Sequence, residues 1–217
     1  MPTLVFAVAP AREGATSRTA YAAACAVAGA AFVAVLAQVS VPLPFTPVPI
    51  TGQTLGVLLV GAAYGPALGP ATLGLYLLWG SLGLPVFAPN ADGSHDAGLA
   101  VLSLTGPTGG YLWGFVVSAW VVGGLARRGW DRNVGSAAAA MLLGEVAIYA
   151  IGLPWLHQAL PGVVGGPVSV GDTLRAGLYP FVVGDAIKLL IAAGALPAVW
   201  RLLARSGGEA RGSRSLD

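Results

Sequence analysis

Residues 181–196 read FVVGDAIKLLIAAGAL, an apolar run that carries one acid, Asp185, and one base, Lys188. The span predicted around it, residues 178–203, is long enough for an α-helix to cross a hydrocarbon core about 30 Å thick. A charge near the bilayer centre costs about 2.5–3.5 kcal/mol, so both side chains are expected to face the protein interior. The stretch therefore predicts a membrane helix with a polar feature turned inward.

The whole chain has the composition of an integral membrane protein. Of its 217 residues, 56% are hydrophobic and 9% are charged, and the mean hydropathy is +0.77, whereas about a quarter of the residues in a soluble domain are charged. Cys25 is the only cysteine, so a disulfide within the chain is excluded and apolar packing is its expected role. The net charge of +2 comes without an aromatic-interleaved basic patch, so nucleic acid is not an expected partner.

The predicted fold class is all-α, a compact bundle of six transmembrane helices. The second and third helices are short and glycine-rich, and they are expected to form a hairpin around Gly65 and Pro66. A cytoplasmic N-terminal tail (residues 1–18), interpreted as a tail and not as a signal peptide, and a polar cytoplasmic C-terminal tail (204–217) are predicted to flank the membrane domain, residues 19–203. The six predicted spans are residues 19–40, 52–64, 66–83, 108–127, 134–154 and 178–203.

Arginine positions indicate the orientation of this bundle. With six spans, nine of the ten arginines fall on one side, and Asp92, Asp96, Asp172 and Arg175 fall on the other. Because Lys and Arg collect in cytoplasmic connections, both termini are predicted to be cytoplasmic. The arginines on that side are Arg12, Arg18, Arg127, Arg128, Arg132, Arg201, Arg205, Arg211 and Arg214.

Three connections then lie outside, at residues 41–51, 84–107 and 155–177. The first contains four prolines within eight residues, a pattern that excludes helix and sheet and favours a stiff extended segment. It could be a lid over the bundle or a rigid surface connector. These prolines are Pro42, Pro44, Pro47 and Pro49.

Asp185 and Lys188 lie three positions apart and so share one helical face. Lys188 is the only lysine among eleven basic residues, which hints at a compact ammonium in a small pocket. Three interpretations remain open: a buried ion pair that fastens the helix, a proton relay through Asp185, or a ligand site in which the acid accepts and the base donates hydrogen bonds.

The other candidates for chemistry are weaker. Glu145 is expected to make a structural hydrogen bond, and His157 is expected to be a membrane-boundary residue; an intramembrane enzyme built on the two is the least supported alternative. His95 with Asp92 and Asp96 is a weak metal signal, so neither a metal nor a cofactor is predicted. The segment LTGPTGGYLWGF (104–115) lacks the Gly-Lys-Ser/Thr ending of a phosphate loop, which excludes a nucleotide site there.

Five blocks of sequence together resemble the BioY family, the biotin-specific substrate-binding (S) components of energy-coupling factor (ECF) transporters. They cover most of residues 20–200. The polar insertion NADGSHDAG (90–98) departs from the family pattern. The blocks are VPLPFTPVPITGQTLGVLLVG (41–61), LGPATLGLYLLWGSLGLPVFA (68–88), GPTGGYLWGF (106–115), GEVAIYAIGLPWL (144–156) and FVVGDAIKLLIAA (181–193).

This resemblance implies biotin uptake without enzymatic activity in this chain. It implies a biotin pocket near the outer face, closed by the loop after the first helix, and assembly with a coupling subunit and two cytoplasmic ATPases in the cell membrane. Asp185 and Lys188 would hold the ureido ring of biotin, whose two N–H donors flank one carbonyl acceptor. The alternative function is a stand-alone proton-coupled carrier that uses Asp185. The other implied contacts are Thr51 and Gln53 as polar groups, Phe45 as an apolar cover, and Tyr111 and Tyr149 as walls.

A stripe of small residues on the first span completes the prediction. Ala22, Ala26, Ala30 and Ala34 recur at a spacing of four, which allows another helix to approach closely. The pattern alone does not say whether that helix belongs to this chain or to another subunit. The family resemblance implies that Ala22, Ala26 and Ala30 contact the coupling subunit.

Overall fold

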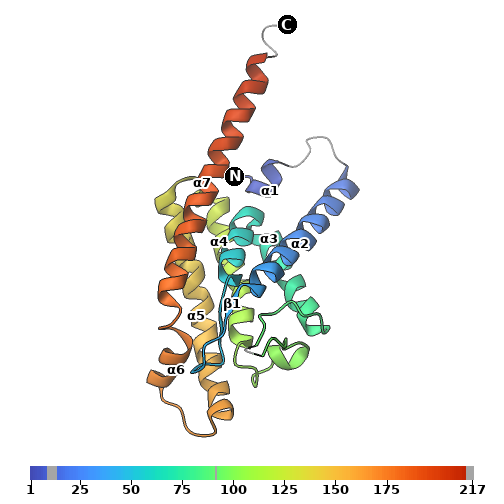
Figure 1. The fold of residues 1–217 in the computed structure, drawn as a ribbon. Helices are drawn as coiled ribbons and strands as arrows, with labels where there is room; N and C mark the ends of the chain where they lie inside the picture. Colours follow the sequence, from blue (N-terminus) through green and yellow to red (C-terminus); the bar gives the residue numbers. More distant parts are fainter. Residues whose placement is uncertain (9–13, 91, 214–217) are drawn as a thin grey trace.

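The computed structural model describes residues 1–8, 14–90 and 92–213. Within these residues, five helices are long and apolar enough to cross a membrane. They are α2 (Ala15–Gln38), α3 (Gln53–Ser81), α4 (Gly109–Arg127), α5 (Val134–Val164) and α7 (Val182–Ser213). Shorter helices are α1 (Leu4–Ala7), η1 (Leu99–Leu102), η2 (Trp130–Arg132) and α6 (Val170–Gly177), and Figure 1 shows how the long helices lie side by side.

The predicted number of six membrane spans is not confirmed, because the second and third spans fall within α3. This helix is broken at Gly65, whose φ of 82° lies in a region that glycine adopts without strain. A Cβ atom on Gly69 would lie 3.3 Å from the Cα of Gly61, although residues eight apart in a continuous helix are separated by about 12 Å. The chain therefore folds back at Gly65, as the predicted hairpin requires, into a first limb (53–64) and a second limb (66–81).

The connections contain more structure than the sequence predicted. The ends of the proline-rich segment pair as two short antiparallel strands, β1 (Ser40–Val41) and β2 (Ile50–Thr51), so the exclusion of sheet was wrong at these ends. The prolines lie between the strands, where no N–H group is needed for the ladder. Helix α5 continues ten residues beyond the predicted end at residue 154, and α6 occupies part of a segment predicted to be a loop.

Hydrogen bonds between segments distant in sequence define one end of the bundle. The Met1 amino group donates to the Arg127 carbonyl over 3.1 Å, and Trp200 Nε1 donates to Asp131 Oδ2 over 2.5 Å. The start of the chain, the end of α4, η2 and the later part of α7 therefore meet at one end. Arg12 and Arg214 of the predicted tails lie outside the described residues.

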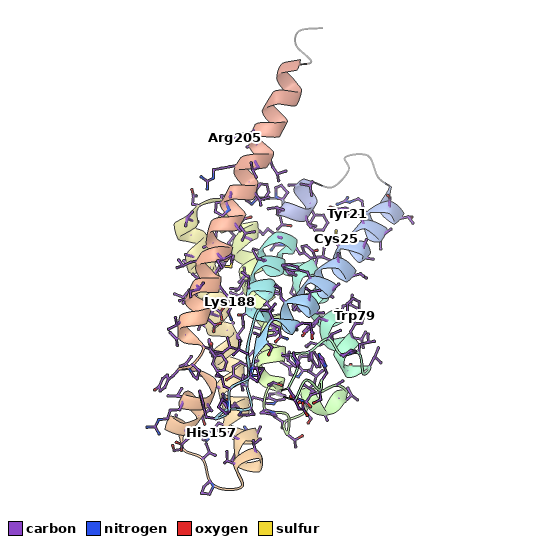
Figure 2. All side chains as sticks on the ribbon, in the orientation of Figure 1. Tyr21, Cys25, Trp79, His157, Lys188 and Arg205 are labelled. Carbon is purple, nitrogen blue, oxygen red and sulfur yellow. The ribbon has the colours of Figure 1, made fainter. Side chains whose placement is uncertain are left out.

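The opposite end is formed by the proline-rich segment, the loop before α4, and α6. Thr46 Oγ1 donates to the Ala176 carbonyl over 2.7 Å, and Trp155 Nε1 donates to the Gly106 carbonyl over 3.1 Å. Figure 2 places His157 toward this end, Arg205 at the other end and Lys188 between them. Lys188 therefore lies part of the way along the bundle and not at either end.

Candidate ligand-binding site

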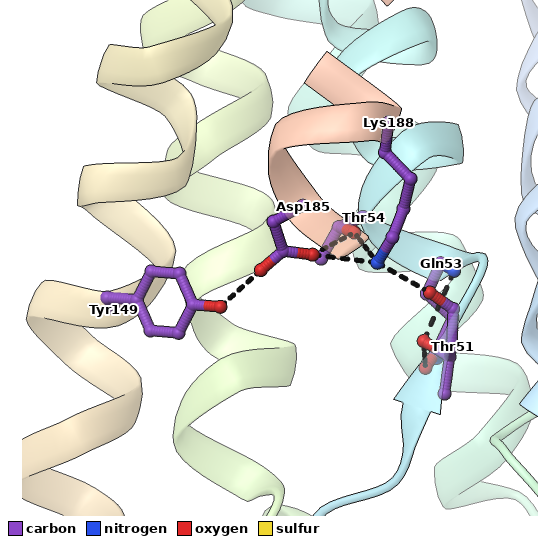
Figure 3. Close-up of polar contacts among 6 residues, drawn as sticks. All are labelled: Thr51, Gln53, Thr54, Tyr149, Asp185 and Lys188. Carbon is purple, nitrogen blue, oxygen red and sulfur yellow. Dashed lines mark hydrogen bonds and ion pairs between the residues drawn. The ribbon is translucent and has the colours of Figure 1, made fainter. Parts of the chain in front are cut away.

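Lys188 uses its ammonium group for three short contacts. Its Nζ lies 2.7 Å from Asp185 Oδ1, and it donates to the Thr51 carbonyl over 2.8 Å and to Thr54 Oγ1 over 2.9 Å. These partners come from the first turns of α7, from β2 and from α3 (Figure 3). Since an ammonium has three donors, the charge is fully hydrogen-bonded inside the bundle.

Asp185 is equally well partnered. Its Oδ1 also accepts from Thr54 Oγ1 over 3.3 Å, and its Oδ2 accepts from the Tyr149 hydroxyl of α5 (Figure 3). Only 7% of the residue is exposed. The buried acid and the half-buried base thus form a neutralised pair that ties α7 to α3 and α5, which is why the fold can hold two charges at this depth.

Thr51 and Gln53 lie beside the pair, as the sequence predicted for polar contacts. Thr51 Oγ1 donates to Gln53 Oε1 over 3.0 Å, and Gln53 Nε2 donates to the Tyr76 hydroxyl over 2.6 Å. Tyr76 in turn donates to the Val86 carbonyl over 2.9 Å. The Gln53 amide is therefore fixed in orientation by the second limb of α3.

A cavity opens next to these side chains, so the acid and base are not enclosed by packed aliphatic residues. It provides about 100 Å³ of space for the centres of water molecules, several times what one bound water requires. Apolar side chains such as Phe87, Phe115 and Phe181 cover much of its wall. Its polar lining is Thr51, Gln53, Thr54, Asn90, Asp96, Thr108, Tyr111, Tyr149, Asp185 and Lys188.

Tyr111 and Tyr149 form one aromatic corner of this cavity. Their ring centroids are 6.1 Å apart with an interplanar angle of 89°, an edge-to-face arrangement. The Tyr111 hydroxyl donates to the Gly177 carbonyl over 2.9 Å, and the Tyr149 hydroxyl donates to Asp185. Each hydroxyl is thus satisfied while each ring faces the cavity.

Phe45 is not part of the cavity lining. It is 65% exposed and lies in a second, shallower groove with Pro44, Leu160 and Arg175. The structure therefore does not bring Phe45 to the other candidate residues, and its role as an apolar cover stays a prediction.

The small-residue stripe on α2 faces α3 of the same chain along part of its length. Ala30 is completely buried in the core, and a Cβ atom on the adjacent Gly29 would lie 2.8 Å from side-chain atoms of Tyr64 and Thr72. Ala30 is therefore inaccessible to a partner subunit in this conformation, a correction to its predicted contact. Ala22 and Ala26 are half-buried, and their contact with a partner stays a prediction.

Sequence reasoning missed the contribution of the 90–98 insertion. Asn90 and Asp96 line the cavity where it meets solvent, and both residues are exposed. Thr54, which contacts both charged side chains, was also missed, although its place one residue after Gln53 on the first turn of α3 could have suggested it. No periodicity marks residues in an irregular loop, so the insertion offered no comparable signal.

Glu145 departs from its predicted role. It is 4% exposed, and neither of its carboxyl oxygens has a hydrogen-bond partner, so the expected structural hydrogen bond is not made. His157 lies twelve residues further along α5, about 18 Å away along the axis, and its Nδ1 is 2.8 Å from Thr173 Oγ1. The structure does not bring Glu145 and His157 together as an enzyme site would require.

Within the described part of the chain, no three His, Cys, Asp or Glu side chains are grouped to hold a metal ion.

Comparisons with known proteins agree with this arrangement. Residues 9–205 match the sequence pattern of the BioY family. "Biotin transporter BioY" of Thermotoga maritima is 35% identical over 163 residues, which cover 75% of this chain and 86% of the relative. "Probable biotin transporter BioY" of Pyrococcus horikoshii is 34% identical over 158 residues, which cover 73% of this chain and 83% of the relative.

A solved structure shares the fold. The S-component for biotin from an ECF-type ABC transporter superposes with a TM-score of 0.70 over 87% of this chain and 95% of that chain. The sequence identity is 23%, so this likeness concerns the fold alone. Together with the five apolar helices, these comparisons show a multi-pass membrane protein.

Proposed function

The chain belongs to the BioY family, and from this premise we propose that it is the biotin-binding S component of an ECF-type transporter. It captures biotin at the outer end of the bundle for uptake into the cell. The observation that carries the proposal is the ion pair of Asp185 and Lys188 at the wall of a cavity, 2.7 Å apart and beside open space.

The chemistry of the ureido ring matches this pair. The ring offers two N–H donors and one carbonyl acceptor, which complement a carboxylate and an ammonium on one helical face. Without a ligand, Lys188 donates to the Thr51 carbonyl and to Thr54, and Asp185 accepts from Tyr149. Biotin would replace some of these contacts, so both charges stay paired whether the site is empty or filled.

The remaining contacts follow from the shape of the cavity. We assign Thr51 and Gln53 as polar contacts to the bicyclic ring and Tyr111 and Tyr149 as its aromatic wall, because all four line the cavity. Phe45 is assigned as a cover that reaches the cavity only if the proline-rich segment moves. The lid hypothesis for that segment is supported by Pro47 and its neighbours, which form part of the lining.

Transport would need partners that supply energy. We propose a transmembrane coupling subunit and two cytoplasmic ATPases, and no reaction catalysed by this chain. Ala22 and Ala26 on the half-buried part of α2 are the proposed contact with the coupling subunit. The proposal takes residues 19–203 as the membrane domain, counts the two limbs of α3 as two spans, and places both termini in the cytoplasm.

A titration with biotin tests the assignment. We expect detergent-solubilised protein to bind biotin without ATP or an ion gradient, and we expect Asp185→Asn and Lys188→Ala to weaken binding by about tenfold to a hundredfold, the value of one charge-assisted hydrogen bond. Asp172→Asn is the matched control, because Asp172 is an exposed acid outside the cavity. Melting curves of each variant separate lost contacts from lost folding.

Two results would reject the proposal: no binding of biotin by the folded wild-type protein, or unchanged affinity in both α7 variants. The alternative, a stand-alone proton-coupled carrier, predicts uptake that needs a proton gradient and no partner subunits. It is not favoured, because Asp185 is already held by Lys188, Thr54 and Tyr149.

A further inference from the structure

The proline-rich segment lies between the cavity and the shallower groove that contains Phe45, called the outer groove from here on. Residues 47–49 line the cavity, and residues 44–47 line the outer groove. The groove is also lined by Ala176 of α6, which the segment reaches from β1 (Figure 1). Because Pro47 belongs to both linings, a single segment of chain forms the boundary between the groove and the cavity.

One hydrogen bond joins the middle of this segment to the rest of the protein. Thr46 Oγ1 donates to the Ala176 carbonyl over 2.7 Å, and it accepts from the Val48 backbone N–H over 3.2 Å. Among the described residues, no other hydrogen bond of residues 42–49 reaches another helix or strand. Four of these eight residues are prolines, which have no N–H group to donate.

The acceptor of this bond is held in place by the cavity wall. Ala176 precedes Gly177, whose carbonyl accepts from the Tyr111 hydroxyl over 2.9 Å. A Cβ atom on Gly177 would lie 2.4 Å from that hydroxyl oxygen and 2.5 Å from Leu156 Cδ2, so the end of α6 is packed tightly there. The helix therefore presents a fixed carbonyl to a segment that is otherwise bonded only through its two strands.

The loop on another side of the cavity, residues 84–98, is tied to α2 and α3 by four hydrogen bonds. All four must break before that loop can move as a unit, whereas residues 42–49 are released by breaking one. The proline-rich segment is therefore the wall that opens most easily. The four bonds join the Tyr76 hydroxyl to the Val86 carbonyl (2.9 Å), the Gln38 amide to the Phe87 carbonyl (3.4 Å), His95 Nε2 to Gln38 Oε1 (2.9 Å), and the Gly98 N–H to the Gly80 carbonyl (2.8 Å).

We propose that the ligand enters and leaves the cavity between the proline-rich segment and α6, and that the Thr46 hydroxyl is the latch that keeps this route closed. The inference rests on the proposed function, because it names the path by which biotin reaches Asp185 and Lys188. When the latch breaks, residues 42–49 move about β1 and β2, and the outer groove becomes continuous with the cavity. Thr46 is a positioning residue, since it holds the wall and does not line the cavity.

A latch has a kinetic signature that a damaged binding site does not have. Loss of the hydroxyl raises the open population of the segment by the same factor in the empty and in the filled protein. Association and dissociation should therefore both become about threefold to tenfold faster, the value of one neutral hydrogen bond, while Kd stays within about twofold. A weakened site would release biotin faster without admitting it faster.

The test compares association and dissociation rates of radiolabelled biotin on the full-length protein in detergent. Thr46→Val removes the hydroxyl at nearly constant volume and should accelerate both rates. Thr46→Ser keeps the hydroxyl and should restore the wild-type rates. Thr105→Val is the matched control, because Thr105 is an exposed threonine in the loop before α4 whose hydroxyl contacts Ser103, and it should leave both rates unchanged.

A second measurement needs no ligand. In a Cys25→Ala background, Leu112→Cys introduces a thiol into the cavity lining, where Leu112 is buried. Addition of Thr46→Val should increase the rate at which a small methanethiosulfonate reagent modifies this thiol by about threefold to tenfold. Addition of Thr105→Val should not change that rate.

The outcomes separate the two proposals. Unchanged association and dissociation rates in the folded Thr46→Val protein would overturn the inference and leave the proposed function standing, because biotin would then use another path. Faster dissociation with no gain in association would also overturn it. If the folded wild-type protein binds no biotin, the proposed function fails, and the thiol measurement then decides whether Thr46 closes the cavity.

Discussion

Single residues in the membrane interior show how few polar groups this fold leaves without a partner. Glu145 is an exception, with both carboxyl oxygens buried and unpartnered, and Ser118 Oγ on α4 is also unpartnered. The two residues lie on helices that face each other, α5 and α4. A Cβ atom on Gly144, which precedes Glu145, would lie 2.9 Å from Ser118 Oγ. A buried carboxyl group without a hydrogen bond costs free energy that the surrounding packing must offset.

Replacing Glu145 should therefore stabilise the protein. We expect Glu145→Met, which keeps the length of the side chain and removes the carboxyl group, to increase the free energy of unfolding by about 1–3 kcal/mol. The apparent melting temperature in detergent is the measurement, and Glu145→Gln, which keeps a polar group, is the control and should gain less. A lower melting temperature for the Met variant would indicate that the carboxyl group has a partner. Biotin affinity should stay within about twofold, because Glu145 does not line the cavity.

Some site residues could be predicted from the sequence and others could not, for physical reasons. Asp185 and Lys188 stand out because an unpaired charge in a membrane span is so costly that it must have a partner. Their position three residues apart then fixes the shared face of the helix. Asp96 carries no such signal, because an acid in a solvent-facing loop costs almost nothing. Its place at the cavity is decided by contacts distant in sequence, such as that of His95 with Gln38.

At the scale of elements, the break in α3 is maintained by close contact with α4. A Cβ atom on Gly123 would lie 2.4 Å from the carbonyl carbon of Gly65 and 2.7 Å from the nitrogen of Pro66. These are backbone atoms of the turn, and they cannot move aside as a flexible side chain could. The hairpin therefore needs a residue without a side chain at position 123.

Adjacent glycines on α4 allow a matched test of this contact. We expect Gly123→Ala to lower stability by about 1–3 kcal/mol through overpacking. Gly124→Ala should be neutral or slightly stabilising, because nothing lies within 4 Å of a Cβ atom there and alanine favours the helix. Melting curves of the two variants in the same detergent give the comparison. Equal melting temperatures would show that α4 does not hold the turn of α3.

The elements themselves were largely predictable, and the exceptions have clear causes. Long apolar runs mark α2, α4 and α7, because only a membrane span needs so many apolar residues in succession. The end of α5 was placed too early, at Pro154, since a proline inside a helix removes one hydrogen bond without necessarily ending it. The helix ends instead at Val164, and Gly165 caps it in a left-handed conformation, with a φ of 75° and an N–H group that donates to the Pro161 carbonyl.

At the scale of the whole molecule, charged residues are distributed unevenly between the two ends of the bundle, and this distribution indicates its orientation in the membrane. Exposed arginines gather where α4 ends and where α7 leaves the bundle, and α7 extends past the other helices at that end (Figure 1). Asp92, Asp96 and Asp172 belong to connections at the opposite end. The exposed arginines at the end of α4 and on the later part of α7 are Arg127, Arg128, Arg201 and Arg205. Because positively charged connections stay in the cytoplasm, the cavity mouth beside Asp96 should face outward.

Labelling of single cysteines in intact cells tests this orientation. In a Cys25→Ala background, which should itself show no labelling, Leu99→Cys introduces a thiol at the cavity end, where Leu99 is 74% exposed. Asn133→Cys introduces one at the arginine end, where Asn133 is also exposed. We expect a membrane-impermeant maleimide to label the first variant in intact cells and the second only after permeabilisation, since the charge asymmetry places the two positions on opposite sides. The reverse pattern would put the cavity mouth in the cytoplasm and would be incompatible with capture of a ligand from outside.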